Sequence, residues 1–231
     1  RRGLVVHDDR LVHVRYFDGA TRASLQTSFS AAKSFVSALV GIAIDANLIG
    51  SVNDRVTDYL PELAERDPGF RQITLRDLLT MSSGIHYEEG GFPSLGDDTY
   101  TYDGVDLRDV ALNRTRIDGP PGLAWHYNNY NPLLLGLVLE RTTRTSVSDF
   151  MARRLWQPLG AEADATWSLD SERSAFEKME SGFNARPVDY ARFGLLFLHN
   201  GEWNGRQIVS EDWVRAATGA EPTSDSAYYA G

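Results

Sequence analysis

The sequence has no cysteine among its 231 residues. This absence excludes disulfide bonds, thiolate catalysis and cysteine-ligated metal, but it does not fix the compartment. The five histidines show neither H-x₃-H nor H-E-x-x-H spacing, so no zinc site is predicted. No G-x-G-x-x-G or P-loop motif occurs either, and we expect no cofactor.

Long apolar runs and clusters of basic residues are also missing. No stretch of about 18 residues is apolar and free of charge, so no membrane span is predicted. The net charge of −9 argues against nucleic acid and anionic membranes as partners. The chain begins with Arg1 and shows no signal peptide, and both a periplasmic or secreted and a cytoplasmic location stay open.

The stretch from Ser28 to Val36 holds the first candidate site. Ser30 and Lys33 stand three residues apart where a polar segment becomes a long apolar run. Because a helix turns once in 3.6 residues, both side chains would lie on one face of its first turn, near free backbone N–H groups. A serine hydroxyl needs a neighbour to take its proton, and a lysine does so only when burial keeps it neutral. The alternative is a purely structural role, in which Ser30 is a helix N-cap and Lys33 a solvated lysine in the first turn.

The predicted elements place this pair at the start of a central helix. Leu4–His7 and Leu11–Phe17 are predicted to form a hairpin with a tight turn at Asp8-Asp9-Arg10, and an apolar helix should run from Ser30 to Leu48. Further helices are expected at Leu75–Met81, Asp106–Asn113, from Ser146 to Trp156, and from Pro187, where they would bury residues up to Leu198. Residues 52–64 read as a connector, and residues 90–102 as a long irregular aromatic loop.

A second pair of polar residues precedes another apolar helix, which begins near Leu133. Tyr127 and Asn129 lie two apart on a predicted extended turn, so their side chains project to the same side. A tyrosine beside a cation can act as general base or acid, and an asparagine amide can bridge a lysine and a substrate. Alternatively, Tyr127 is a packing aromatic and Asn129 an N-cap. His126 is a weaker candidate base, because adjacent residues on an extended turn point apart.

Together, three motifs carry a resemblance that covers most of the chain. They are Ser30-Ala31-Ala32-Lys33, then Leu78-Leu79-Thr80-Met81-Ser82-Ser83-Gly84, then Tyr127-Asn128-Asn129. In this order they resemble the serine β-lactamase-related hydrolases, the relatives of class C β-lactamases, D-Ala-D-Ala carboxypeptidases, some esterases and 6-aminohexanoate-dimer hydrolases. Gly182–Gly194 and Ile208–Val214 look like later helices of that family.

The resemblance implies an α+β fold, with an antiparallel sheet flanked by helices and a mainly helical subdomain inserted at about residues 60–180 of a single domain. It also implies an acyl-enzyme on Ser30, with Lys33 or Tyr127 as the base and Asn129 orienting Lys33 and substrate. A small-molecule ester or amide is the expected substrate. Which of Lys33 and Tyr127 is the base stays open, because the two would titrate as a coupled pair.

One departure from the family pattern stands out. The family has a third motif, K-T-G or H-x-G, on a later strand, and no such triplet occurs between Trp213 and Gly231. Tyr228-Tyr229 resembles the start of a strand. We therefore expect a domain lacking its C-terminal strands: a fragment, a partner of a second chain that supplies the remainder, or a deletion. The competing hypothesis is a catalytically impaired fragment or a non-catalytic binding or sensor module of the same fold.

Overall fold

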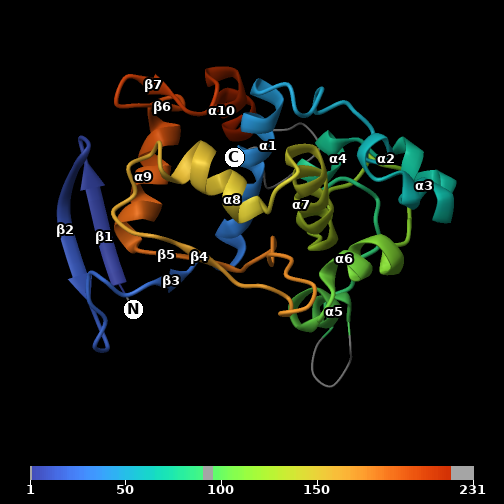
Figure 1. Ribbon diagram of the computed structural model, residues 1–231, viewed down its shortest axis with the longest axis horizontal. Coiled ribbons are helices and arrows are strands. Elements are labelled where there is room, and N and C mark those ends of the chain that lie inside the picture. The colour runs from blue at the N-terminus through green and yellow to red at the C-terminus, as the bar shows by residue number, and fades with distance from the viewer. Residues whose placement is uncertain (1, 91–95, 220–231) are drawn as a thin grey trace.

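The computed structural model describes residues 2–90 and 96–219. Figure 1 shows the hairpin of β1 and β2 at one end beside α9, α1 near the middle, and α2 to α6 at the other end. The strands are β1 (Arg2–His7), β2 (Arg10–Tyr16), β3 (Gln26–Thr27), β4 (Thr166–Trp167), β5 (Phe183–Ala185), β6 (Glu202–Trp203) and β7 (Arg206–Gln207).

Helices make up most of the regular structure. The α-helices are α1 (Ala32–Asp45), α2 (Val56–Tyr59), α3 (Pro61–Arg66), α4 (Leu75–Leu79), α5 (Asp97–Asp103), α6 (Leu107–Asp109), α7 (Tyr130–Thr143), α8 (Val147–Met151), α9 (Pro187–Leu198) and α10 (Glu211–Thr218). The 3₁₀-helices are η1 (Phe29–Ala31) and η2 (Pro68–Gln72), and the π-helices are η3 (Val110–Arg114) and η4 (Ala152–Trp156). The fold is α+β, as the sequence predicts.

The strands pair antiparallel, but not in one sheet. Among the described residues, β1 pairs with β2, β3 and β4 flank β5, and β6 pairs with β7, which gives three small sheets. The predicted hairpin is confirmed, and its turn holds Asp8 and Asp9 at positive φ. Within this part of the chain the expected antiparallel pairing is divided among these three sheets, and Tyr228-Tyr229 lies outside the described residues.

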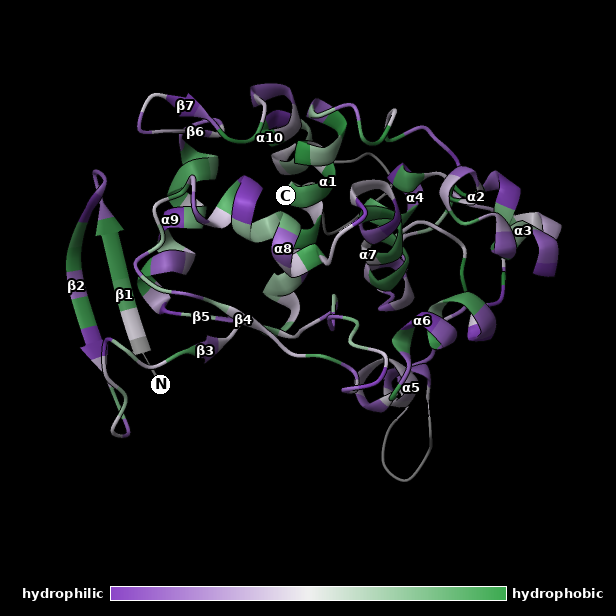
Figure 2. Ribbon diagram, viewed as in Figure 1, coloured by the Kyte–Doolittle hydropathy of each residue, from purple (hydrophilic) through white to green (hydrophobic). Residues whose placement is uncertain are grey.

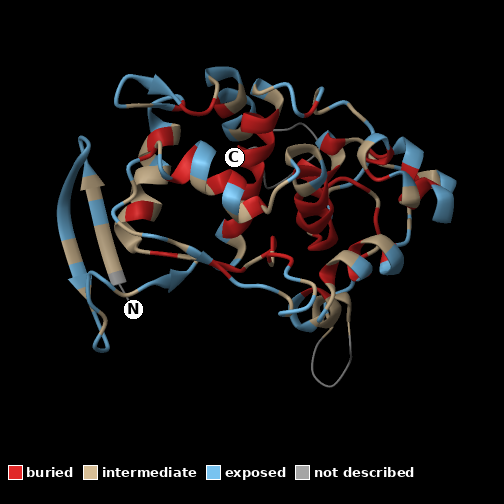
Figure 3. Ribbon diagram, in the orientation of Figure 1, coloured by how far each residue is buried: buried red, intermediate tan, exposed pale blue. Residues whose placement is uncertain are grey.

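Helices α1 and α7 form the interior. They pack against each other, and Figure 3 shows both as largely buried. In Figure 2 the hydrophobic colours gather on α1, α7 and β1, while α3 at the periphery is mostly hydrophilic. A helix that is apolar nearly all round has no solvent face, and this explains why α1 lies in the centre.

An aromatic cluster fixes α1 to α9 and to β5. The Phe35 ring stacks on Phe193 with 4.0 Å between centroids and lies 4.6 Å from the ring of Phe183. These large rings remove much apolar surface from water, and their mutual contacts add to that stabilisation. The first turns of α1 therefore have little freedom to move.

Several local predictions are confirmed by capping geometry. The Thr74 side chain accepts the Asp77 N–H at the start of α4, and Ser146 accepts from Asp149 at the start of α8. Pro187 stands at the first position of α9, where its missing N–H costs nothing.

Three local predictions are wrong. The segment 52–64 is not a simple connector, because α2 and α3 form there and Pro61 opens the second of them. Part of the loop expected at residues 90–102 is helix α5, in which Asp97 and Asp98 lie at the positive end of the helix dipole. Residues 91–95 of that loop lie outside the described residues. Leu198 was expected in the core but is 72% exposed, because it ends the last turn of α9.

Among residues 2–90 and 96–219, no helix is both long and apolar enough to cross a membrane.

Two helical glycines allow a test of the packing. A Cβ at Gly41 in α1 would overlap the Trp213 ring, whereas one at Gly194 in α9 would meet nothing within 4 Å. We expect Gly194→Ala to raise the free energy of unfolding by up to about 1 kcal/mol through helix propensity. Gly41→Ala should lower it, because overpacking costs about 1–3 kcal/mol and outweighs that gain. Urea unfolding measures both, and shifts of the same sign would contradict this account.

Candidate active site

Ser30 and Lys33 meet at the start of the central helix. Ser30 lies in η1, which directly precedes α1, and Lys33 lies in the first turn of α1. Lys33 Nζ donates a hydrogen bond to Ser30 Oγ at 3.2 Å. Ser30 is half-buried, while Lys33 is completely shielded from solvent. The alternative of a solvated lysine is therefore wrong.

The residue before Ser30 has an unusual backbone. Phe29 adopts φ +48°, a left-handed conformation that bulky residues rarely take, and its side chain is 72% exposed. The preceding Ser28 N–H donates to the Phe183 carbonyl of β5 at 2.8 Å. Strain of this kind persists only where the surroundings enforce it, and here the contact with β5 fixes the backbone that presents Ser30.

Tyr127 completes a three-residue contact around the Ser30 hydroxyl. Its OH donates to Ser30 Oγ at 2.8 Å, and Lys33 Nζ lies 4.8 Å from the centre of its ring. The segment that carries Tyr127 is held by the His126 N–H, which donates to the Met81 carbonyl at 2.7 Å. The structure thus brings together Ser30, Lys33 and Tyr127, which lie up to 97 positions apart in the chain.

Asn129 lies behind this group and is fully buried. Its Nδ2 donates to the Tyr87 hydroxyl at 2.8 Å, and its Oδ1 has no hydrogen-bond partner within the described residues. It does not act as a side-chain cap of α7, since the Tyr130 N–H is accepted by Asn128 instead. The structure leaves one buried acceptor oxygen on Asn129, which is unusual because such groups are normally paired.

Sequence reasoning missed Glu180. Lys33 Nζ donates to the Glu180 backbone carbonyl at 2.8 Å, and the Glu180 side chain is completely buried. No motif marks this residue, and it lies 147 positions from Lys33. A run of sequence that contains Glu177, Lys178 and Glu180 looks like an ordinary charged surface, so only the tertiary structure reveals the contact.

Burial changes the acid–base chemistry of this group. Removal of Lys33 from water lowers its pKa to about 7, although the charges of Glu180 and, less strongly, Glu89 oppose the change. Burial also raises the pKa of the Glu180 carboxyl. A large share of Lys33 is therefore neutral at neutral pH, which an exposed lysine would not be.

Two histidines, His86 and His126, stand next to Tyr87 and Tyr127 in the chain and have contacts of their own. The His86 ring bonds to the carboxylate of Asp118, and its Nε2 lies 2.6 Å from the Arg116 guanidinium. The His126 Nε2 lies 2.7 Å from the Tyr87 carbonyl, which implies that this nitrogen carries its proton and donates. Both histidines fix loops around the site, and His126 does not take the position of a base beside Ser30.

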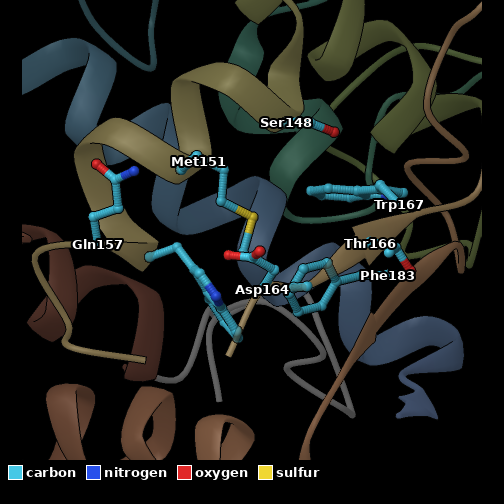
Figure 4. A pocket seen from close by; sticks show the side chains of 10 residues that line it. Ser148, Met151, Gln157, Asp164, Thr166, Trp167 and Phe183 are labelled. Atoms are coloured by element: carbon cyan, nitrogen blue, oxygen red, sulfur yellow. The ribbon is translucent and has the colours of Figure 1, made fainter. Parts of the chain in front are cut away.

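A cavity of about 320 Å³ lies elsewhere, beside α8, η4 and the strands β4 and β5. Figure 4 shows Met151, Trp167 and Phe183 around it. None of Ser30, Lys33, Tyr127 and Asn129 lines it. Within the described part of the chain, no group of three His, Asp or Glu side chains is placed to hold a metal ion.

Comparison with known proteins shows which fold the chain shares. The fold is shared with a penicillin-binding protein from Bacillus halodurans, with a TM-score of 0.71 at 17% identity, over 94% of this chain and 73% of the other. It is also shared with a Bacillus anthracis protein provisionally assigned as a 6-aminohexanoate-dimer hydrolase. That structure gives a TM-score of 0.84 at 28% identity, over 95% of this chain and 59% of the other.

The chain belongs to the Beta-lactamase family, whose model matches residues 4–228. A 6-aminohexanoate-dimer hydrolase from Paenarthrobacter ureafaciens is 26% identical over 228 residues. The match covers 92% of this chain and 55% of that relative, so the chain spans about half the length of that protein. The resemblance drawn from the three motifs is confirmed at the level of the family.

The burial of Lys33 predicts how stability depends on pH. Between about pH 7 and the ordinary lysine value of 10.5, the unfolded chain holds a proton on Lys33 that the folded chain has lost. Stability should therefore rise with pH, by about 2 kcal/mol between pH 7 and pH 9 from this group. Chemical unfolding across that range measures the slope, and Lys33→Met should abolish this contribution while Lys178→Arg should keep it. An equal slope in the Lys33→Met variant would contradict the assignment.

Proposed function

We propose that the protein is a serine hydrolase in which Ser30 forms an acyl-enzyme with an amide or ester substrate. The observation that supports this most directly is the position of Ser30 Oγ, within hydrogen-bond reach of both Lys33 Nζ and Tyr127 OH. A hydroxyl with two such neighbours has both a group that can take its proton and a group that can return it.

The first step is attack by Ser30 on the substrate carbonyl. When Lys33 is neutral, its contact with Ser30 reverses and the serine O–H donates to Nζ. The Oγ–carbonyl bond then forms as Nζ takes the serine proton, and the tetrahedral intermediate carries a negative oxygen. The C–O or C–N bond of the leaving group breaks as Tyr127 or the protonated Lys33 supplies a proton. Water then hydrolyses the acyl-enzyme with the same groups acting as base.

Lys33 and Tyr127 act as a pair in this proposal. The Lys33 ammonium lies close to the Tyr127 ring, and a cation in that position favours the phenolate over the phenol. Protonation of one group affects the other, so the two would titrate with shared values. We assign Asn129 to substrate binding, because its buried Oδ1 has no partner within the described residues and could accept a hydrogen bond from a substrate N–H.

The substrate class is a small amide or ester. Two similar proteins carry names that describe a hydrolase of a 6-aminohexanoate dimer, which favours an amide-cleaving reaction for this chain. We also propose that residues of about 60–180 form a helical part inserted into the domain. This arrangement accounts for how Tyr127 reaches Ser30 from a separate part of the chain.

The second candidate function is a catalytically impaired hydrolase or a binding module of the same fold, in which the developing oxyanion lacks one of its donors. The Ser30 N–H would supply one donor to the developing oxyanion, and the strand with K-T-G or H-x-G would supply the other. Loss of one such donor typically lowers the rate by about 10²–10³-fold. A chain without it, and without a second chain to provide it, would be an impaired hydrolase or a binding module of the same fold.

A serine-reactive fluorophosphonate distinguishes these functions. We expect one adduct by intact mass on the parent protein, in which Ser30 Oγ bonds to phosphorus and fluoride leaves. Ser30→Ala should give none, and Tyr127→Phe should react about 10²-fold more slowly, because it lacks the hydroxyl that contacts Ser30.

Ser34→Ala is a matched control, since Ser34 lies in the same helix just after Lys33 and should react like the parent. An equal adduct on the Ser30→Ala variant would overturn the assignment of the nucleophile. A folded parent protein with no adduct at any pH would favour the binding module.

A further inference from the structure

Glu180 is a buried acid whose side chain the mechanism above does not use. It lies between Met179 and Ser181, shortly before β5, and is 0% exposed. The Ser181 hydroxyl donates to its Oε1 at 3.0 Å, and its Oε2 has no hydrogen-bond partner within the described residues. Burial of a carboxyl group with an unpaired oxygen is costly, so such a residue needs a reason.

The geometry suggests that the Glu180 carboxyl is buried at this position because it acts on Lys33. The Glu180 backbone carbonyl accepts a hydrogen bond from the Lys33 ammonium at 2.8 Å, so the residue that anchors Lys33 also carries a buried carboxyl group. Burial is the larger effect and raises the pKa of the Glu180 carboxyl, while the electrostatic interaction of the carboxyl with the ammonium favours the charged form of each. Lys33 has no carboxylate of its own in direct contact within the described ion pairs.

We propose that Glu180 is a positioning residue whose carboxylate controls the protonation of Lys33 while its carbonyl holds the ammonium against Ser30. Burial alone would drive Lys33 far toward the neutral form, and the Glu180 charge counteracts this. The result is a lysine that can accept and return a proton near neutrality, which acid–base catalysis needs. This inference rests on the proposed function, because it assigns Lys33 a catalytic proton.

Other charged groups near the pair act more weakly or in the opposite sense. Glu89 also favours protonated Lys33, and Lys178 favours ionised Glu180. The Tyr127 ring faces the ammonium, and Tyr102 interacts with Glu180 from α5. Among these groups, Glu180 has the largest opposing effect on Lys33. Removal of the Glu180 charge should therefore change the titration of Lys33 more than any other property of the site.

The chain allows a direct measurement, because Lys33 and Lys178 are its only lysines. In a Lys178→Arg background labelled with ¹³C-lysine, the NMR signal of the side chain reports the titration of Lys33 alone. We expect Glu180→Gln to move the Lys33 midpoint downward by roughly half a pH unit or more. The rate of fluorophosphonate labelling should fall at low pH as Lys33 becomes protonated. The midpoint of this fall, the acid limb of the pH profile, should move by the same amount and in the same direction.

Glu177 provides the matched control. It is 2% exposed and also has an unpaired Oε2, but its Oε1 accepts from the Ser148 N–H, away from Lys33. Glu177→Gln should leave the midpoint of Lys33 unchanged, and Glu180→Asp should keep most of the parent value. If Glu180→Gln does not fold, Glu180→Met can be used instead, because it removes the charge and retains the volume. Apolar residues of similar volume often replace buried charged groups without loss of stability.

A Lys33 midpoint that stays in place without the Glu180 charge, or that moves equally with Glu177→Gln, would overturn the inference. The two proposals fail separately. Absence of labelling at every pH would refute the nucleophile, while the NMR midpoint would still show whether Glu180 controls Lys33. If the Glu180→Gln variant is still labelled and its acid limb does not move, Ser30 remains the nucleophile and the proposed role of Glu180 is rejected.

Discussion

The burial of one ammonium group is the constraint on which the site depends. Lys33 lies inside the protein at the start of the central helix, and its three named contacts come from different parts of the chain: the Ser30 hydroxyl, the Tyr127 ring and the Glu180 carbonyl. A charge removed from water destabilises the fold unless such partners offset it. Because the partners come from η1, from the segment before α7 and from the segment before β5, the position of Lys33 ties these three segments together. Its lowered pKa follows from the same burial.

The rest of the structure keeps this arrangement rigid. The apolar surface of α1 is buried against α7 and against the aromatic cluster of Phe35, Phe183 and Phe193. One bond, from the Ser28 N–H to the Phe183 carbonyl, links the aromatic cluster directly to the strained turn before Ser30. The polar end of the helix thus carries the reactive groups, while its apolar length supplies the stability that holds them.

Family membership and geometry support the same class of chemistry by independent routes. The family match rests on the sequence as a whole, while the contacts around Ser30 rest on three side chains. The chain covers 55% and 59% of the length of the two proteins named for 6-aminohexanoate-dimer hydrolysis. Asn129 Oδ1 and Glu180 Oε2 are both buried and have no hydrogen-bond partner within the described residues.

The sequence by itself determined the hairpin, the apolar helices and their caps, because these follow from local patterns of period two or 3.6 and from single residues such as Thr74 and Pro187. It also identified Ser30, Lys33, Tyr127 and Asn129 as candidates, because motif spacing is a local property. It missed the short helices α2, α3 and α5, which have only 4, 6 and 7 residues and are too short to show a helical period in the sequence. Only the tertiary structure decided that Lys33 is buried, that Asn129 contacts Tyr87, and that Glu180 lies beside the lysine. The physical reason is that burial and electrostatic coupling depend on what surrounds a side chain, and residues distant in sequence supply those surroundings.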